Sequence, residues 1–130
     1  MSDLILHEYE SSPFSEKVRL VMGLKGLAYR SVEVPVMLPK PDVVALTGGY
    51  RRTPFLQVGA DIYCDTALIC DVLEHIRPEP TIYPPHLKGA CRIFAQWADT
   101  TCCTPVSAVG YSDGWGTRRS STSQISALSQ

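Results

Sequence analysis

The sequence predicts an α/β domain with the element order β-α-β-(α)-β-β-α, followed by one further helix and an irregular tail. Two observations predict this order. Four short segments have the apolar runs or the alternation of strands, and the longer segments between them repeat apolar residues every three or four positions. The strands are expected at 4–7, 29–34, 55–58 and 61–64. A chain of 130 residues has room for one domain and a fragment of another.

The boundaries of the first elements follow from their end residues. After the apolar run Leu4–His7, the spacing of apolar residues predicts a helix over Pro13–Lys25. Ser12 is a natural N-cap, the proline stands in the first turn, where its missing N–H costs nothing, and Gly26 ends the helix. Residues 35–49 contain three prolines and two glycines, which predicts a loop with about one helical turn.

The second half of the domain is a hairpin followed by a helix. Gly59-Ala60 predicts a tight connection between two strands. Asp65 or Thr66 then caps a helix that ends at Arg77-Pro78. The apolar stripe expected to face the core is Leu68, Ile69, Val72, Leu73 and Ile76.

Two segments follow this domain. A further helical pattern runs from Leu87 to Thr101, and its wide apolar face requires a partner surface. Residues 105–130 are rich in Ser, Gly and Thr, which favours disorder.

Composition argues against several functional classes. Twelve basic against thirteen acidic residues leave a net charge of −1, which gives nucleic-acid binding little support. No apolar run approaches the ~20 residues of a membrane-spanning helix, and the N-terminus does not resemble a signal peptide, so no membrane segment and a cytoplasmic location are expected. The five cysteines form no Cys-x-x-Cys pair and no zinc pattern, so reduced, mostly buried thiols and no metal site are expected.

Three ordered motifs make residues 4–76 resemble the N-terminal, thioredoxin-like domain of the glutathione S-transferase family. Ser12-Pro13-Phe14, running into a helix with Lys17-Val18-Arg19, is similar to the family's Ser-Pro-Phe or Cys-Pro-Phe turn. Thr53-Pro54-Phe55-Leu56 is similar to its Val-Pro-x-Leu, in which the proline is cis. Asp65-Thr66-Ala67-Leu68-Ile69 is similar to its Glu-Ser-x-x-Ile. The order and spacing of the three motifs imply a thioredoxin-like fold, with glutathione as co-substrate.

The resemblance makes Ser12 the catalytic candidate. A serine hydroxyl at a helix N-terminus can donate a hydrogen bond to the glutathione sulfur, which favours the nucleophilic thiolate. Ser11 and Tyr9 are alternatives, because related classes place Ser or Tyr slightly earlier in this turn. A purely structural N-cap is the competing interpretation of Ser12.

The resemblance also implies the residues that bind glutathione. Thr53, before a cis Pro54, would pair through its backbone with the cysteinyl part, whereas an ordinary trans Thr-Pro is the alternative. Thr66 would bind the γ-glutamyl carboxylate and Asp65 the ammonium, although Asp65 alone reads equally as an N-cap. Lys40 and Arg52 lie in the loop that reaches the glycyl carboxylate in the family, and solvated side chains are their alternative.

The implied protein binds glutathione and conjugates its thiolate to small electrophiles. We expect residues 1–80 to be the thioredoxin-like glutathione-binding domain, 81–104 a linker and the first helix of a truncated all-helical domain, and 105–130 the tail. In the family that helical domain supplies most of the electrophile pocket and much of the dimer interface. A non-catalytic glutathione-binding or protein-interaction module is therefore the alternative, and a homodimer stays open.

A third option, a thiol-disulfide oxidoreductase, is disfavoured. Ser12 and Ser15 stand where redox cysteines would be needed, so such an activity would have to depend on Cys64 or Cys70.

Overall fold

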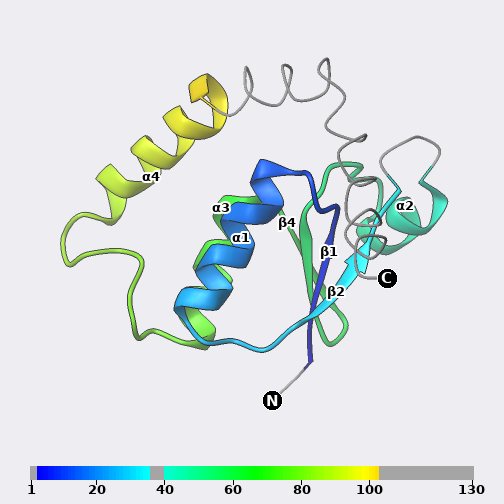
Figure 1. Cartoon of the computed structure of the whole chain (residues 1–130), viewed down its shortest axis with the longest axis horizontal. Coiled ribbons are helices and arrows are strands. Elements are labelled where there is room, and N and C mark those ends of the chain that lie inside the picture. Colours follow the sequence, from blue (N-terminus) through cyan, green and yellow to red (C-terminus); the bar gives the residue numbers. More distant parts are fainter. Residues whose placement is uncertain (1–2, 36–39, 103–130) are drawn as a thin grey trace, which may run out of the picture.

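A computed structural model describes residues 3–35 and 40–102, in which a four-stranded sheet is the centre of the fold (Figure 1). The strand order is β2-β1-β3-β4. β1 and β2 are parallel, and the two other pairs are antiparallel. The strands are β1 (Leu4–Glu8), β2 (Arg30–Glu33), β3 (Phe55–Val58) and β4 (Asp61–Cys64). The predicted order of elements is therefore confirmed.

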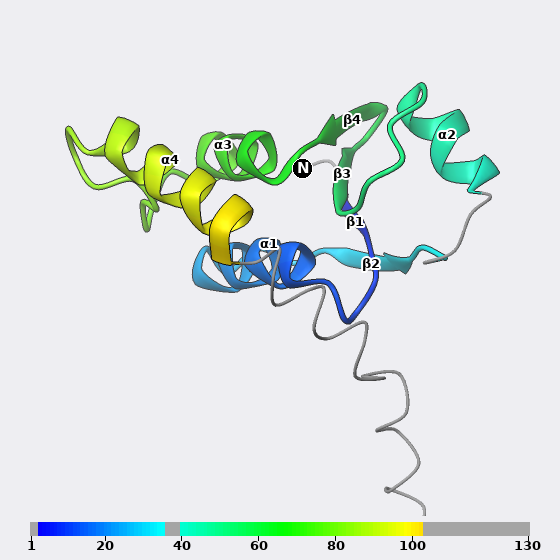
Figure 2. The same cartoon turned by 90° about the horizontal axis from the view of Figure 1, so that it is seen from above.

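Helices cover both faces of the sheet. α1 (Pro13–Leu24) and α3 (Thr66–Ile76) lie on one side and α2 (Pro41–Thr47) on the other, as Figure 2 shows from above. The larger core lies under the first two helices and consists of Leu4, Leu6, Val18, Met22, Leu56, Ile69 and Leu73. A smaller core of Val34, Val43 and Phe55 belongs to the side of α2. Burial of these apolar side chains is the main favourable contribution to folding.

Two expectations from the sequence need correction. The loop predicted over 35–49 contains α2, a seven-residue helix, because Pro41 starts it and Gly48 ends it in the left-handed conformation. Leu68 does not face the core: its side chain is 45% exposed, whereas its neighbour Ile69 is fully buried. One residue corresponds to a turn of about 100° around a helix, so only one of two adjacent residues can face the centre of the contact.

The last described elements are α4 (Lys88–Trp97) and a π-helical segment, Ala98–Cys102. Polar contacts connect them to the domain. Arg92 is ion-paired with Asp71 of α3, and Lys17 Nζ of α1 lies 2.6 Å from an Asp99 carboxylate oxygen.

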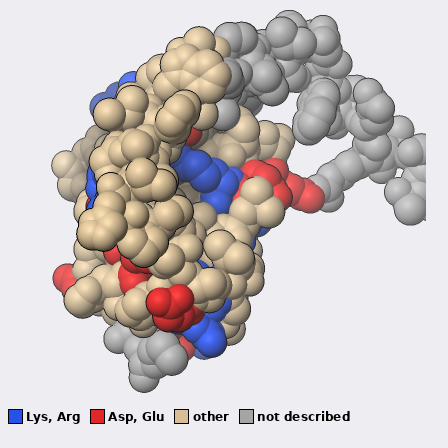
Figure 3. Space-filling model, turned by 90° about the vertical axis from the view of Figure 1, so that its left-hand side faces the viewer, with Lys and Arg blue, Asp and Glu red and all other residues tan. Residues whose placement is uncertain are grey.

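The predicted apolar face of α4 has no partner surface among the described residues. Its exposed members are Leu87, Phe94 and Trp97, and the neighbouring Ile93 is exposed as well. In Figure 3, which views the molecule from the side of α4, most of the upper part of the face is neither acidic nor basic. The predicted tail, 105–130, lies outside the described residues.

Candidate functional site

The register of the sheet brings the three motifs to one edge. His7 of β1 stands opposite Phe55 of β3, and Phe55 stands opposite Cys64 of β4. The segment after β1, the segment before β3 and the segment after β4 therefore meet at the same edge of the sheet. These segments carry Ser12, Thr53-Pro54 and Asp65-Thr66.

Ser12 is the N-cap of α1. Its side chain is buried, and its Oγ accepts a hydrogen bond from the backbone N–H of Ser15 over 3.3 Å. Its own backbone N–H donates to the Tyr9 carbonyl over 3.1 Å. The capping role is therefore confirmed. A hydroxyl that accepts one bond still has its hydrogen to donate, so capping leaves the catalytic role open.

A cavity of about 330 Å³ lies next to this turn. Its lining residues are Tyr9, Phe14, Lys40, Arg51, Arg52 and Thr53. The peptide bond between Thr53 and Pro54 is cis, as the family resemblance implies. Three of the residues singled out from the sequence for binding, Lys40, Arg52 and Thr53, are thus brought together. Ser12, Asp65 and Thr66 share the edge of the sheet but do not line this cavity.

Lys40 is the most unusual member of the cavity wall. It is only 8% exposed, and its Nζ lies 5.6 Å from the centroid of the Tyr9 ring. No carboxylate within residues 3–35 and 40–102 forms an ion pair with it. The ammonium of Lys40 therefore adds a positive charge to the cavity wall that no ion pair among these residues neutralises. The cavity is therefore suited to an anionic group.

The N-terminus of α3 forms the third part of the site. Asp65 has φ 79° and ψ 130°, a conformation that costs a non-glycine residue about 1–3 kcal/mol. Its carboxylate accepts a hydrogen bond from the Ala67 N–H over 3.3 Å, which makes it the N-cap. Thr66 is buried and begins the helix, where backbone N–H groups and the helix dipole favour an anion.

Tyr50 is a site residue that the sequence reasoning missed. Its side chain is half-buried, and the charges of Asp65 and Arg52 act on its phenol. Burial and the Asp65 carboxylate together raise the pKa of the Tyr50 phenol. No sequence motif links the two residues, because Asp65 lies fifteen positions further along the chain.

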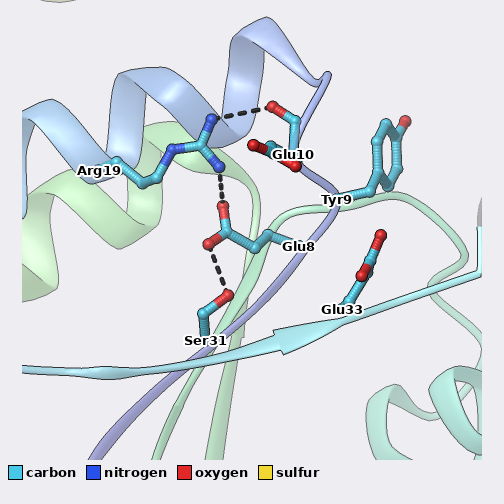
Figure 4. Close-up of a pocket in the computed structure, with 6 residues that line it drawn as sticks. All are labelled: Glu8, Tyr9, Glu10, Arg19, Ser31 and Glu33. Atoms are coloured by element: carbon cyan, nitrogen blue, oxygen red, sulfur yellow. Dashed lines mark hydrogen bonds and ion pairs between the residues drawn. The ribbon is translucent and has the colours of Figure 1, made fainter. Parts of the chain in front are cut away.

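A second cavity, of about 180 Å³, lies on the other side of Tyr9 (Figure 4). Its centre is the buried carboxylate of Glu8, which accepts hydrogen bonds from Arg19 and from Ser31 Oγ, the latter over 2.8 Å. Arg19 also donates to the carbonyl of Glu10 over 3.1 Å. The network connects β1, α1 and β2. Because protein groups provide the hydrogen bonds of the Glu8 carboxylate, its role is structural.

The described thiols do not form a redox centre. Cys64, Cys70 and Cys91 are free, and only Cys70 is buried, the other two being half-buried rather than buried as expected. Burial raises the pKa of the Cys64 and Cys70 thiols, which reduces the reactive thiolate. In the described ranges no group of three or more His, Cys, Asp or Glu could hold a metal ion. No helix there is long and apolar enough to span a bilayer.

Comparison with protein families identifies the family of the chain. A family model described as glutathione S-transferase, N-terminal domain, matches residues 6–81. The chain belongs to the glutathione S-transferase family. Its four-stranded mixed sheet with helices on both faces is the thioredoxin-like fold of that family's N-terminal domain.

The relatives of this chain are longer proteins. It is 24% identical over 99 residues to glutathione S-transferase U4 of Arabidopsis thaliana, covering 75% of this chain and 44% of the relative. A solved GST-like protein from Pseudomonas syringae is 55% identical with a TM-score of 0.71, over 77% of this chain and 36% of that one. Rice GST1, solved in complex with glutathione, is 22% identical with a TM-score of 0.68, over 75% and 47%. The chain thus spans less than half the length of these relatives.

Proposed function

We propose that this chain binds glutathione at the edge of the sheet formed by the three motifs. The observation that carries the proposal is Lys40, a buried residue in the wall of a 330 Å³ cavity, which has no ion pair among the described residues. Arg51 and Arg52 add two exposed positive charges to the same wall. Glutathione has two carboxylates and one ammonium, so one end of it matches this cationic wall.

The proposed orientation assigns each part of the tripeptide to one segment. The glycyl carboxylate lies against Lys40 and Arg52. The backbone of Thr53 pairs with the cysteinyl part, as an added strand would. The γ-glutamyl carboxylate lies at the N-terminus of α3, where Thr66 receives it, and Asp65 binds the ammonium. Rice GST1, which shares the fold at 22% identity, was solved with glutathione.

Isothermal titration with glutathione tests the binding. Lys40→Met is expected to weaken the affinity about 10- to 100-fold, because a hydrogen-bonded charge partner is lost. The control is Arg30→Met, which removes the same charge from an exposed ion pair with Asp3 at the start of β2. Equal affinity of Lys40→Met and the parent chain, or no binding by the parent chain, would contradict the proposal.

We further propose that Ser12 activates the bound thiol. Its hydroxyl hydrogen, which capping does not use, donates to the glutathione sulfur and lowers the thiol pKa. The thiolate then attacks the electrophilic carbon of a small molecule such as a chlorinated nitroaromatic: an S–C bond forms, and chloride leaves with the electrons of the broken bond. Formation of the thioether, followed by absorbance, tests turnover.

Glutathione binding without turnover is the second candidate. The apolar face of α4 favours it, since Phe94 is 69% and Trp97 54% exposed. In this case residues 1–80 act as a binding module, 81–104 contribute the linker and α4, and 105–130 form a tail. Titration heat without thioether formation supports this alternative and excludes the enzyme. Under either candidate we expect a cytoplasmic protein. As further partners we propose a small electrophile and a second copy of the chain in a homodimer.

A further inference from the structure

We propose that the ring of Tyr9 is a positioning group that holds the Lys40 ammonium in the cavity wall for the glycyl carboxylate of bound glutathione. This inference rests on the proposed function and deepens it. Lys40 Nζ lies over the Tyr9 ring, 5.6 Å from its centroid, and both residues line the same cavity. A cation within about 6 Å of the face of an aromatic ring is attracted by the quadrupole of the ring. The contact uses the face of the ring and does not need the hydroxyl.

Lys40 is fixed at its backbone, and the Tyr9 ring holds the far end of its side chain. The Lys40 carbonyl accepts a hydrogen bond from the Val44 N–H over 3.1 Å, in the first turn of α2. Within residues 3–35 and 40–102 no ion pair holds the ammonium. A long side chain that is already in place loses less conformational entropy when a carboxylate binds to it. The ring contact therefore preorganises the cationic wall.

Tyr9 is itself placed by β1 and by the turn into α1. It directly follows Glu8, the last residue of β1, whose buried carboxylate accepts a hydrogen bond from Ser31 Oγ over 2.8 Å. The Tyr9 carbonyl accepts a hydrogen bond from the Ser12 N–H over 3.1 Å. Tyr9 therefore connects the N-terminus of α1 with Lys40 at the start of α2, two parts of the site that lie on different segments.

Titration with glutathione in a double-mutant cycle tests the contact. Tyr9→Leu keeps an apolar side chain but removes the aromatic face, and should weaken glutathione binding about 3- to 10-fold. The same change should weaken binding much less in Lys40→Met, because the cation is already absent. Tyr9→Phe keeps the ring and should recover most of the affinity that Tyr9→Leu loses. Tyr83→Leu is the matched control: it removes a ring that lies 5.0 Å from Lys88 Nζ, outside the cavity wall, and should leave the affinity unchanged.

Two further readouts separate positioning from general damage. The glycyl monoethyl ester of glutathione lacks the carboxylate that Lys40 would bind, so Tyr9→Leu should leave the affinity for this ester unchanged. In the free chain, the methylene protons next to the Lys40 ammonium should give an upfield-shifted NMR signal, because the current of the Tyr9 ring acts on protons above its face. This shift should persist in Tyr9→Phe and vanish in Tyr9→Leu.

The inference is overturned if Tyr9→Leu binds glutathione like the parent chain, weakens binding of the ester to the same extent, or weakens glutathione binding equally in Lys40→Met. Equal losses in Tyr9→Phe and Tyr9→Leu also overturn it, since the hydroxyl and not the ring would then act. If the parent chain binds glutathione but lacks the NMR shift, the inference alone is wrong. If it has the shift but binds no glutathione, the proposed function is wrong and the inference falls with it.

Discussion

Lys25→Met is expected to lower the free energy of unfolding by about 2–4 kcal/mol. The Lys25 side chain is fully buried at the end of α1. Its Nζ donates to the carbonyls of Arg77 and Pro80 over 2.7 and 3.0 Å, and it lies 2.6 Å from a Glu74 carboxylate oxygen. All three partners belong to the C-terminal end of α3 or to the segment after it. This one ammonium therefore connects the end of α1 to the end of α3.

The magnitude follows from what methionine keeps and loses. Methionine replaces the aliphatic stem, so packing changes little. Removing one partner of a buried ion pair costs about 3–5 kcal/mol. The cost is lower here because Glu74 is 18% exposed and keeps two donors, the Thr81 hydroxyl and the Ile82 N–H at 3.2 Å.

The effect should depend on pH. Partial burial acts to raise the pKa of Glu74, but hydrogen bonds from Lys25, Thr81 and the Ile82 backbone outweigh it and hold the pKa below its ordinary value of 4.5. A depressed carboxyl pKa stabilises the fold at neutral pH, and this stability is lost as the pH falls through the lowered pKa. The difference between the parent chain and Lys25→Met should therefore narrow below pH 4.5.

Urea denaturation at neutral and acidic pH measures both effects. Lys88→Met is the control, since Lys88 is exposed and lies 3.4 Å from Asp71; its loss should stay within about 0.5 kcal/mol. If Lys25→Met lowers the free energy of unfolding by less than about 1 kcal/mol, or by an amount that does not change with pH, the conclusion that the buried Lys25 ion pair stabilises the packing of α1 against the end of α3 is wrong.

Two further predictions concern α1 and α4. Ser12→Gly removes the hydroxyl but costs helix capping only a few tenths of a kcal/mol, so the Tm should hardly change. The thiol pKa of bound glutathione, measured from thiolate absorbance, should rise because the hydrogen bond to the sulfur is lost. An unchanged thiol pKa would show that Ser12 is only a helix cap. Partial burial of Asp71 acts to raise its pKa, but hydrogen bonds from Tyr83 and Arg92 hold the pKa below its usual range. Acidification through that lowered pKa should therefore speed amide exchange in α4 and leave exchange in α1 unchanged. Asp71→Asn at neutral pH should have the same effect.

The sequence predicted elements well wherever local signals agree. The hairpin of β3 and β4 has the predicted bounds, because two short strand runs flank Gly59, whose φ of 62° suits the turn. α2 was underestimated because a proline can equally start a helix or interrupt one. The burial of Lys25 could not be predicted, since it depends on partners about fifty residues away in sequence.

The candidate site likewise combines features that could be predicted from local sequence and features that depend on the fold. The N-caps at Ser12 and Asp65 could be predicted because capping depends on adjacent residues. The cavity wall required the fold, since the sheet register and not sequence distance brings Tyr9 next to Thr53. The effect of the Asp65 charge on the Tyr50 phenol leaves no trace in the sequence, because the fold and not a motif relates these two residues.

Two departures of this chain from the family motifs, at Thr53 and at Asp65-Thr66, fall where the proposed binding uses backbone groups at least in part. Thr53 replaces the usual valine at a position whose proposed contact is made by the backbone. Asp65-Thr66 replaces Glu-Ser at a helix start, where the N–H groups and the dipole attract an anion and a shorter carboxylate still caps the helix. Ser12, the position whose side chain would do the chemistry, keeps a hydroxyl. In the proposed function, binding therefore uses backbone groups that these substitutions leave in place, whereas catalysis depends on a single side chain.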